Sequence, residues 1–85
     1  MEKYKLQIKK SAQKEIASLS KKDLKFILKA IKDLALDPRG LNCKKLSGEE
    51  KYRKRVGRNR ILYEIQDNVL MVFVVKVAHR KEAYR

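Results

Sequence analysis

Basic and proton-carrying side chains are concentrated in two stretches of this chain. The first, Lys51–Arg60, contains six Lys or Arg side chains and no acidic one. The second closes the chain and contains His79, Arg80 and Tyr84. A guanidinium group presents a planar fork of donors that matches the geometry of a phosphate. Two such stretches in one small chain indicate a polyanionic ligand, and nucleic acid is the polyanion they fit.

These side chains are also the kinds that RNA cleavage by its own 2′-hydroxyl group requires without a metal. Arginines can hold the scissile phosphate in line and stabilise the charge that grows on its non-bridging oxygens. A proton must leave the 2′-oxygen and another must reach the 5′-oxygen, and His79, with an unperturbed pKa of about 6.5, can carry one near neutral pH. Tyr84 is a second proton carrier if neighbouring cations lower its pKa from about 10, and its ring can instead stack on a base.

Cleavage and simple binding use different parts of this set. The candidate catalytic residues are Arg60, Arg80, Tyr84 and His79, and the candidate RNA-binding residues are Arg53, Lys54, Arg55, Arg58, Lys51, Lys44 and Lys45. The alternative is a plain RNA-binding module, in which only the positive charge matters and the histidine and tyrosine do nothing. The acidic residues are scattered and no His, Cys or Asp cluster has the spacing of metal ligands, so we expect neither a metal nor a cofactor.

Length and composition limit the class of protein. With 85 residues, the chain is expected to form a single domain over residues 1–85. Its 23 Lys and Arg against 10 Asp and Glu give a net charge of +13. Cys43 is the only cysteine, which excludes an internal disulfide. No apolar run reaches the roughly 18 residues of a membrane span, and the N-terminus lacks a signal-peptide core. We therefore expect a soluble cytoplasmic protein with no membrane partner.

The first half of the chain predicts a strand and two helices. Alternating apolar residues predict a strand over Lys3–Lys9. Ser11 is placed to cap a short first helix. Ser20, with an acidic residue three positions later, marks the start of a second helix. Apolar residues repeat every three to four positions over Lys21–Leu36, and Asp37–Gly40 ends that helix with a proline and a glycine.

The second half predicts a sheet that carries the basic stretches. Leu41–Glu50 is expected to be an irregular crossing. Strands are predicted at Lys51–Val56, Arg60–Gln66 and Val69–Val77, with turns at Gly57–Asn59 and Asp67–Asn68. The fold class is α+β: a small antiparallel-rich sheet with two N-terminal helices packed on one face, in the order β-α-α-β-β-β. On such a sheet Arg53 and Arg55 share a face, and Arg60 returns beside them.

Two segments resemble a known protein family. Tyr52–Ile65 reads YRKRVGRNRILYEI, and the chain closes with VAHRKEAYR. Together with the order of the predicted elements, they resemble the RelE toxins of the RelE/ParE superfamily, over nearly the whole chain. The most specific parts are the Arg-x-x-Tyr-Glu strand and the His-Arg…Tyr ending.

The resemblance implies a function, partners and a site. RelE-type toxins of bacteria and archaea enter the ribosomal A site and cut mRNA there without a metal, leaving a 2′,3′-cyclic phosphate and a 5′-hydroxyl. A cognate antitoxin blocks the toxin, and the pair binds operator DNA to repress its own operon. The family's basic and tyrosine positions correspond here to Arg53, Lys54, Arg55, Arg60, Arg80 and Tyr84. The implied roles are phosphate and transition-state contacts for the arginines, and base stacking or proton transfer for the tyrosine.

One difference from the RelE family leaves the general base open, and one related group of toxins leaves the function open. The best-studied members have lysines where this chain has Arg53 and Arg55. Because arginine is a poor proton acceptor, His79 is the alternative general base. ParE-like toxins share the fold but inhibit DNA gyrase, and they generally lack the ribonuclease residues. A ParE-like gyrase inhibitor is therefore the second functional hypothesis beside the ribonuclease.

Overall fold

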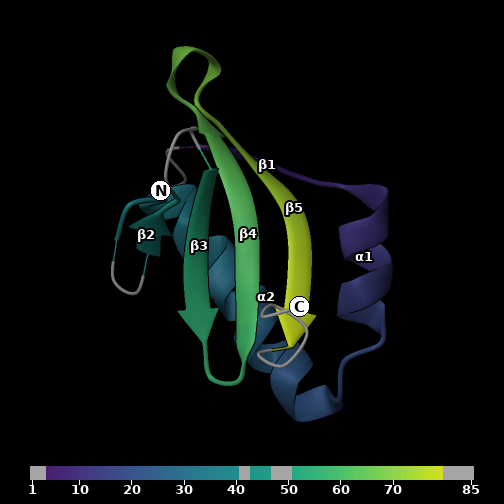
Figure 1. Cartoon of the computed structure of the whole chain (residues 1–85). Helices are drawn as coiled ribbons and strands as arrows, with labels where there is room; N and C mark the ends of the chain where they lie inside the picture. Colours follow the sequence, from purple (N-terminus) through teal and green to yellow (C-terminus); the bar gives the residue numbers. More distant parts are fainter. Residues whose placement is uncertain (1–3, 41–42, 47–50, 80–85) are drawn as a thin grey trace.

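The computed structural model describes residues 4–40, 43–46 and 51–79. Its elements are β1 (Lys5–Ile8), α1 (Lys10–Ala17), α2 (Lys21–Leu36), β2 (Cys43–Lys45), β3 (Lys51–Val56), β4 (Asn59–Gln66) and β5 (Met71–His79). The predicted α+β class, with two N-terminal helices packed on a sheet, is confirmed (Figure 1). No helix within the described residues is long and apolar enough to cross a membrane.

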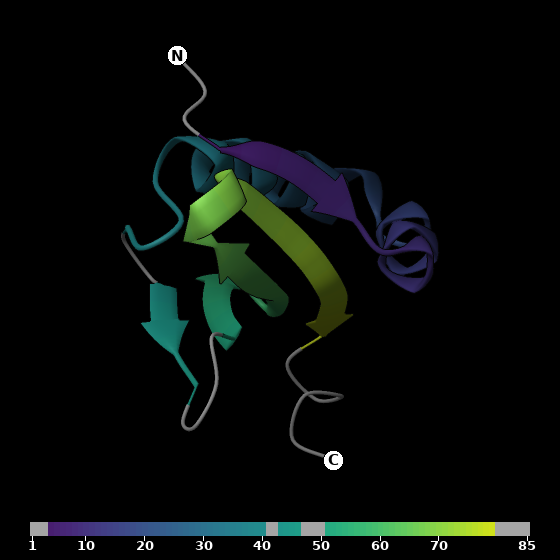
Figure 2. The same ribbon diagram turned by 90° about the horizontal axis from the view of Figure 1, so that it is seen from above.

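The strands form one mixed sheet in the order β1-β5-β4-β3-β2. β1 runs parallel to β5, and every other neighbouring pair is antiparallel. α2 crosses one face of the sheet, while α1 lies at the β1–β5 side of the molecule (Figures 1 and 2). β5 is therefore an interior strand, as its apolar sequence predicts.

The second helix begins and ends where the sequence predicts. α2 covers Lys21–Leu36, and the Ser20 hydroxyl accepts a hydrogen bond from the Asp23 backbone N–H at 3.3 Å. The prediction for the first helix was wrong in its cap. Lys9 occupies the N-cap position of α1 without a side-chain cap bond, and Ser11 lies inside the first turn. Only Lys9 separates the end of β1 at Ile8 from the start of α1 at Lys10, so the helix has begun before the chain reaches Ser11.

The two hairpins differ in how well the sequence describes them. The turn predicted at Gly57–Asn59 is one residue shorter in the structure: Val56 pairs with Asn59, so only two residues join β3 and β4, and Gly57 has φ +59°. This matches a type II′ turn, in which glycine takes the first central position. The two-residue turn predicted at Asp67–Asn68 was wrong. A 3₁₀ turn at Asp67–Val69 is followed by Leu70 at φ +49° before β5 begins.

A short strand forms where an irregular crossing was predicted. Cys43–Lys45 make up β2, which pairs antiparallel with β3 through Lys44 opposite Arg53. A segment of three residues is too short to show the alternation of apolar and polar residues that predicts a strand. It is a strand because its backbone pairs with the edge of β3, a long-range contact that the local sequence does not predict.

A β-bulge changes which side chains of β5 enter the core. Tyr63 pairs with Val74 and Leu62 pairs with Lys76, so Val75 has no counterpart on β4. The extra residue reverses the alternation of faces along β5. Val74 and Val77 are consequently both buried against the helices, although they are an odd number of positions apart.

The edge of β5 beyond the end of β1 is closed by a side chain. Pairing between β1 and β5 stops at Ile8 opposite Val74. Further along, Glu15 of α1 accepts a hydrogen bond from the Val77 backbone N–H at 3.1 Å. Its other carboxylate oxygen lies 3.6 Å from the Lys76 ammonium group. Glu15 thus satisfies a strand amide that would otherwise face the α1 side without a partner.

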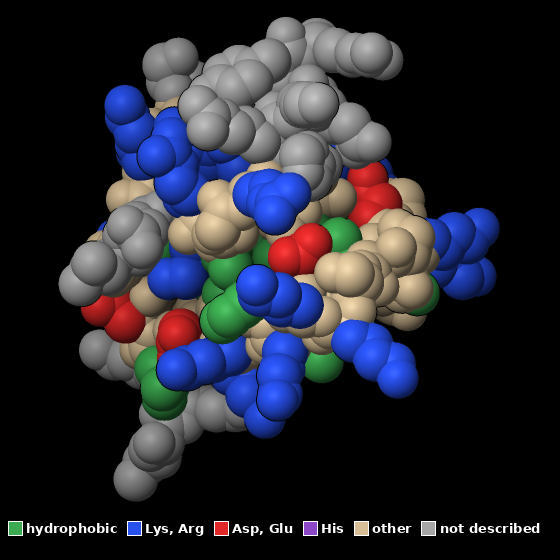
Figure 3. All heavy atoms as spheres, turned by 90° about the horizontal axis from the view of Figure 1, so that it is seen from below, with side chains coloured by type: hydrophobic (Ala, Val, Ile, Leu, Met, Phe, Trp, Pro, Cys, Tyr) green, Lys and Arg blue, Asp and Glu red, His purple; other side chains and the backbone are tan. Residues whose placement is uncertain are grey.

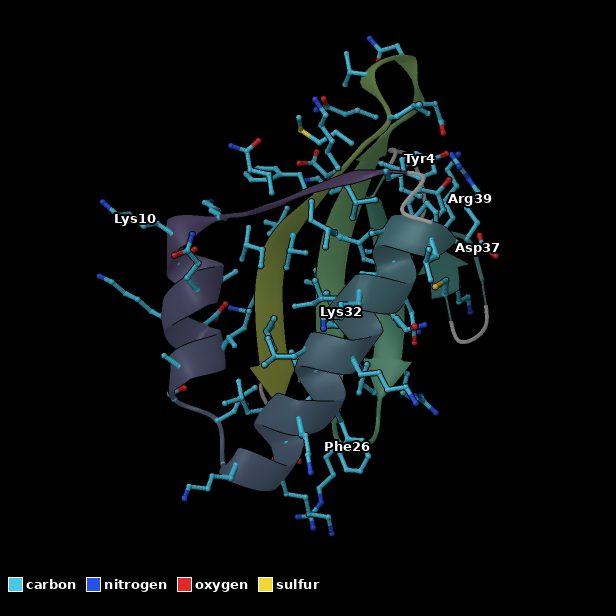
Figure 4. The ribbon with its side chains drawn as sticks, turned by 180° about the vertical axis from the view of Figure 1, so that it is seen from behind. Tyr4, Lys10, Phe26, Lys32, Asp37 and Arg39 are labelled. Atoms are coloured by element: carbon cyan, nitrogen blue, oxygen red, sulfur yellow. The ribbon has the colours of Figure 1, made fainter. Side chains whose placement is uncertain are left out.

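A charged cluster ties the opposite end of the sheet together. Arg39, which follows α2, makes two hydrogen bonds with Asp67 of the β4–β5 turn, at 3.1 and 2.8 Å. The Tyr4 hydroxyl donates to the same carboxylate at 2.9 Å, and the Arg39 guanidinium lies 5.4 Å from the centroid of the Tyr52 ring. The guanidinium of Arg39 and the hydroxyl of Tyr4 lower the pKa of Asp67. The Asp67 carboxylate thus joins its own turn to Tyr4 and to Arg39, which lie close together in Figure 4.

We predict that Asp67→Asn destabilises the fold at neutral pH. Because the pKa of Asp67 is lowered in the folded state, its contribution is present above the unfolded value of about 3.9. That contribution is lost as the pH falls through the lowered folded pKa. The urea midpoint of the variant should lie below that of the native chain at pH 7, and the difference should close in acid. Asp33→Asn, at an exposed site on α2, is the control. An equal difference at pH 7 and in acid would contradict the assignment.

Candidate nucleic-acid interface

One face of the sheet collects the arginines of β3 and β4. Tyr52, Ile61 and Tyr63 point toward the helices and are buried in the core. The residues that alternate with them point the other way. Lys44 pairs with Arg53, which pairs with Leu62; in the next row on the same face, two residues further along, Arg55 pairs with Arg60. We call the side defined by Arg53, Arg55 and Arg60 the arginine face.

Two arginines of this face lie directly opposite each other. Arg55 and Arg60 are cross-strand partners at the hairpin end of β3 and β4, which confirms the predicted proximity. Like charges placed directly opposite each other destabilise a sheet pair. Arg60 is also only 3% exposed, whereas Arg55 is exposed. A buried arginine paired with an exposed one across two strands presents two guanidinium groups to a single anion.

A hollow lies next to this pair. Its volume is about 310 Å³, and Cys43, Lys44, Arg53 and Arg55 line it. The three cations come from two neighbouring strands, so their backbone positions are fixed by the sheet. A phosphate or a nucleotide fits the charge of this lining.

The other predicted RNA-binding residues divide between the two sides of the sheet. Lys51 lies on the arginine face, opposite Glu64. Lys54 and Lys45 alternate to the helix side, and the Lys54 ammonium group donates to the Cys43 sulfur at 4.0 Å. Arg58 is exposed in the hairpin turn. Some of the predicted RNA-binding residues therefore lie on the arginine face, whereas Lys45 and Lys54 lie on the opposite side of the sheet, toward the helices.

The C-terminal candidates are placed only in part. The backbone of His79 ends β5 and pairs with Asn59, one row beyond the Arg55–Arg60 pair. The His79 side chain and the residues Arg80 and Tyr84 lie outside the described part of the chain. Their expected meeting with Arg60 stays a prediction. In the described ranges, no three His, Cys, Asp or Glu side chains converge as metal ligands do.

Two side chains near the site were not assigned from the sequence. Lys76 pairs with Leu62 in the row that contains Arg53, so it belongs to the arginine face. The bulge at Val75 sets this position, and no sequence signal announces the bulge. Tyr63 lies behind the face: burial, followed by a hydrogen bond with Cys43, raises the pKa of its hydroxyl. That hydroxyl donates to the Pro38 carbonyl, so Tyr63 is not suited to accept a proton.

The sequence and fold match known toxins. The family model described as ParE toxin of the type II toxin–antitoxin system parDE matches residues 6–84. The structure is similar to one from the toxin–antitoxin complex RelBE2 of Mycobacterium tuberculosis, with 28% identity, 94% of each chain covered and a TM-score of 0.81. It is also similar to the isolated Escherichia coli RelE toxin, with 27% identity, coverage of 95% and 90%, and a TM-score of 0.79.

A more distant relative shares the fold. A YoeB/ParE toxin from Agrobacterium tumefaciens shares 17% identity, with 88% of this chain and 96% of that chain covered and a TM-score of 0.76. At that identity the likeness concerns the fold alone. No curated protein sequence matches the chain.

We predict that Arg55→Gln stabilises the free protein. Removing the charge opposite Arg60 should raise the free energy of unfolding by about 0.2–1 kcal/mol at low salt. In about 1 M salt the gain should shrink, because the Debye length falls to about 3 Å. Urea denaturation at both ionic strengths measures the effect.

Lys51→Gln is the matched control, because it removes a cation from the same strand that faces Glu64 rather than an arginine. Its effect should have the opposite sign. If both variants destabilise the chain equally, repulsion between Arg55 and Arg60 is not a feature of the folded protein.

Proposed function

The chain belongs to the RelE/ParE superfamily and is a toxin of the type II toxin–antitoxin class, and from this we propose that it is an endoribonuclease that cuts mRNA in the ribosomal A site. The observation that carries the proposal is the register of β3 and β4, which sets Arg55 against Arg60 with Arg53 on the same face. Three arginines on two paired strands can hold the scissile phosphate and its neighbours in a fixed orientation.

The proposed reaction needs only the RNA and the protein's side chains. The 2′-oxygen loses its proton and attacks the adjacent phosphorus; the bond to the 5′-oxygen breaks, and that oxygen takes up a proton. The products are a 2′,3′-cyclic phosphate and a 5′-hydroxyl. Arg60, held in a buried position, and Arg80 would stabilise the charge on the non-bridging oxygens.

The remaining roles are proposed from the chemistry of each side chain and from the resemblance to RelE toxins. Arg53 and Arg55 would hold the flanking phosphates, together with Lys44 and Lys51 on their face. His79 would act as the general base, because arginine at the neighbouring positions holds its proton too firmly. Tyr84 would stack on a base or return the proton to the 5′-oxygen.

We also propose a cognate antitoxin as the inhibitory partner. The similar structures from Mycobacterium tuberculosis and Pyrococcus horikoshii are toxin–antitoxin complexes. An acidic segment over the arginine face would neutralise the charges that RNA needs. Such a complex would be the form that binds operator DNA.

Gyrase inhibition is the second candidate, because the matching family model is a ParE toxin model. The two activities differ in what they need from the arginine face. A nuclease requires Arg60 and the C-terminal candidates as reacting groups, whereas a gyrase inhibitor requires only a binding surface.

We predict growth arrest on induced expression, with primer extension showing cuts inside translated codons of a reporter mRNA. Arg80→Ala/Tyr84→Ala should abolish the arrest and lower cleavage by at least about 10²-fold, the usual loss when one transition-state donor is removed. Lys32→Ala, on the outer side of α2 (Figure 4), is the matched control and should cleave like the native chain.

The outcomes separate the hypotheses. Arrest with intact mRNA and DNA damage would replace the nuclease with a gyrase inhibitor. Full cleavage by the double variant would remove Arg80 and Tyr84 from the mechanism. Arg55→Ala, an exposed position where folding is not at risk, should weaken cleavage and would extend the test to the described arginine face.

A further inference from the structure

A large aromatic side chain is exposed beside the β3–β4 hairpin. Phe26 of α2 is 55% exposed, and Figure 4 shows it at the end of α2 that lies next to this hairpin. A hollow of about 360 Å³ opens between the helix and the hairpin. Phe26, Lys29, Ala30 and Asp33 line it from α2, and Lys54, Arg55, Val56 and Gly57 line it from the hairpin. We call it the Phe26 cleft.

Phe26 is not required by the core. The side of α2 that packs on the sheet carries Ile27, Ile31 and Leu34, all of which are buried. Phe26 precedes Ile27 and lies off that buried stripe. More than half of the Phe26 surface is open to solvent, and apolar surface left in water contributes nothing to stability. An external partner that covers the ring would account for it.

The charge of the cleft indicates an anionic partner. Its lining contains three cations, Lys29, Lys54 and Arg55, and one acid, Asp33. Arg55 also lines the hollow on the arginine face, so the two hollows border the same residue. Figure 3, which views this end of the molecule, shows Lys and Arg side chains spread over it with hydrophobic side chains between them. A polyanion held on the arginine face can therefore continue past Arg55 into the cleft.

We propose that the Phe26 cleft binds one unpaired nucleotide of single-stranded RNA, with its base stacked on the Phe26 ring and its phosphate held by Arg55 and Lys29. The proposal rests on the proposed function, since the arginine face must hold RNA for the strand to reach the cleft. A π-face flanked by cations is how proteins hold unpaired bases without reading their sequence. An acidic peptide would satisfy the cations, but it would leave the flat ring without a matching partner.

The first experiment replaces the ring by a reporter. The chain contains no tryptophan, so Phe26→Trp has a single indole whose emission reports on position 26. A single-stranded oligoadenylate should quench this emission as its bases stack. Inorganic polyphosphate of equal charge, which has no bases, should not quench it, and neither should polyglutamate.

Leu28→Trp is the matched control. Leu28 is an exposed apolar residue on the same helix, 46% exposed, and it lines a separate hollow with Lys21, Leu24 and Lys25. Its indole should not respond to the oligonucleotide. Equal quenching of both variants, or of Phe26→Trp by polyglutamate, would overturn the proposal.

Affinity measurements test the ring and the cation separately. Phe26→Ala and Phe26→Leu should each weaken binding of a labelled single-stranded RNA by roughly tenfold, the scale of one lost base stack. Leu28→Ala should leave it unchanged. Lys29→Gln should weaken binding and lower the salt dependence, whereas Lys25→Gln should have less effect. Equal losses in Phe26→Ala and Leu28→Ala would overturn the proposal.

A cross-link identifies the RNA and keeps this inference separate from the nuclease. A benzophenone side chain at position 26, in a translating extract, should attach to mRNA or to ribosomal RNA, and sequencing shows which. Attachment to protein alone would overturn the proposal. If the native chain cuts reporter mRNA but the indole shows no base-dependent quenching, only the cleft proposal fails. If quenching occurs without any cutting, only the nuclease proposal fails.

Discussion

The register of β3 against β4 is the constraint on which the site depends. Two residues connect these strands, and the positive φ of Gly57 sets their alignment at Val56 opposite Asn59. A shift of one residue would turn every side chain of one strand to the other face. Tyr52 and Tyr63, stacked with ring centroids 5.8 Å apart, would then leave the core. The same packing that holds the two tyrosines inside therefore holds Arg53, Arg55 and Arg60 outside.

Acidic side chains bind cations at both ends of the sheet, and they leave the cations of the β3–β4 hairpin without an acidic residue in their row. Asp67 binds Arg39 at one end, and Glu15 binds Lys76 and the Val77 amide at the other. Neither acid lies in the Arg55–Arg60 row. The acidic side chains thus serve the connections between elements, while the cations of the hairpin remain concentrated where β3 and β4 turn. In a chain with a net charge of +13, an anionic ligand is the group that best offsets that concentration.

The sequence predicts local structure well and tertiary detail poorly, for a physical reason in each case. α2 follows from its apolar period and from Ser20, and β3 follows from its position before a glycine turn. Face sharing by Arg53 and Arg55 needs only alternation. β2, the bulge at Val75 and the cluster around Asp67 depend on partners far along the chain. Local patterns contain no information about such pairings.

The position of Arg55 connects the strand geometry with a path for a ligand. β2 (Cys43–Lys45) pairs with β3 as far as Lys54, and Arg55 is the next residue of β3. Arg55 lines both the hollow on the arginine face and the Phe26 cleft. Arg55 is thus the residue at which a phosphate site on the sheet adjoins an aromatic site on α2.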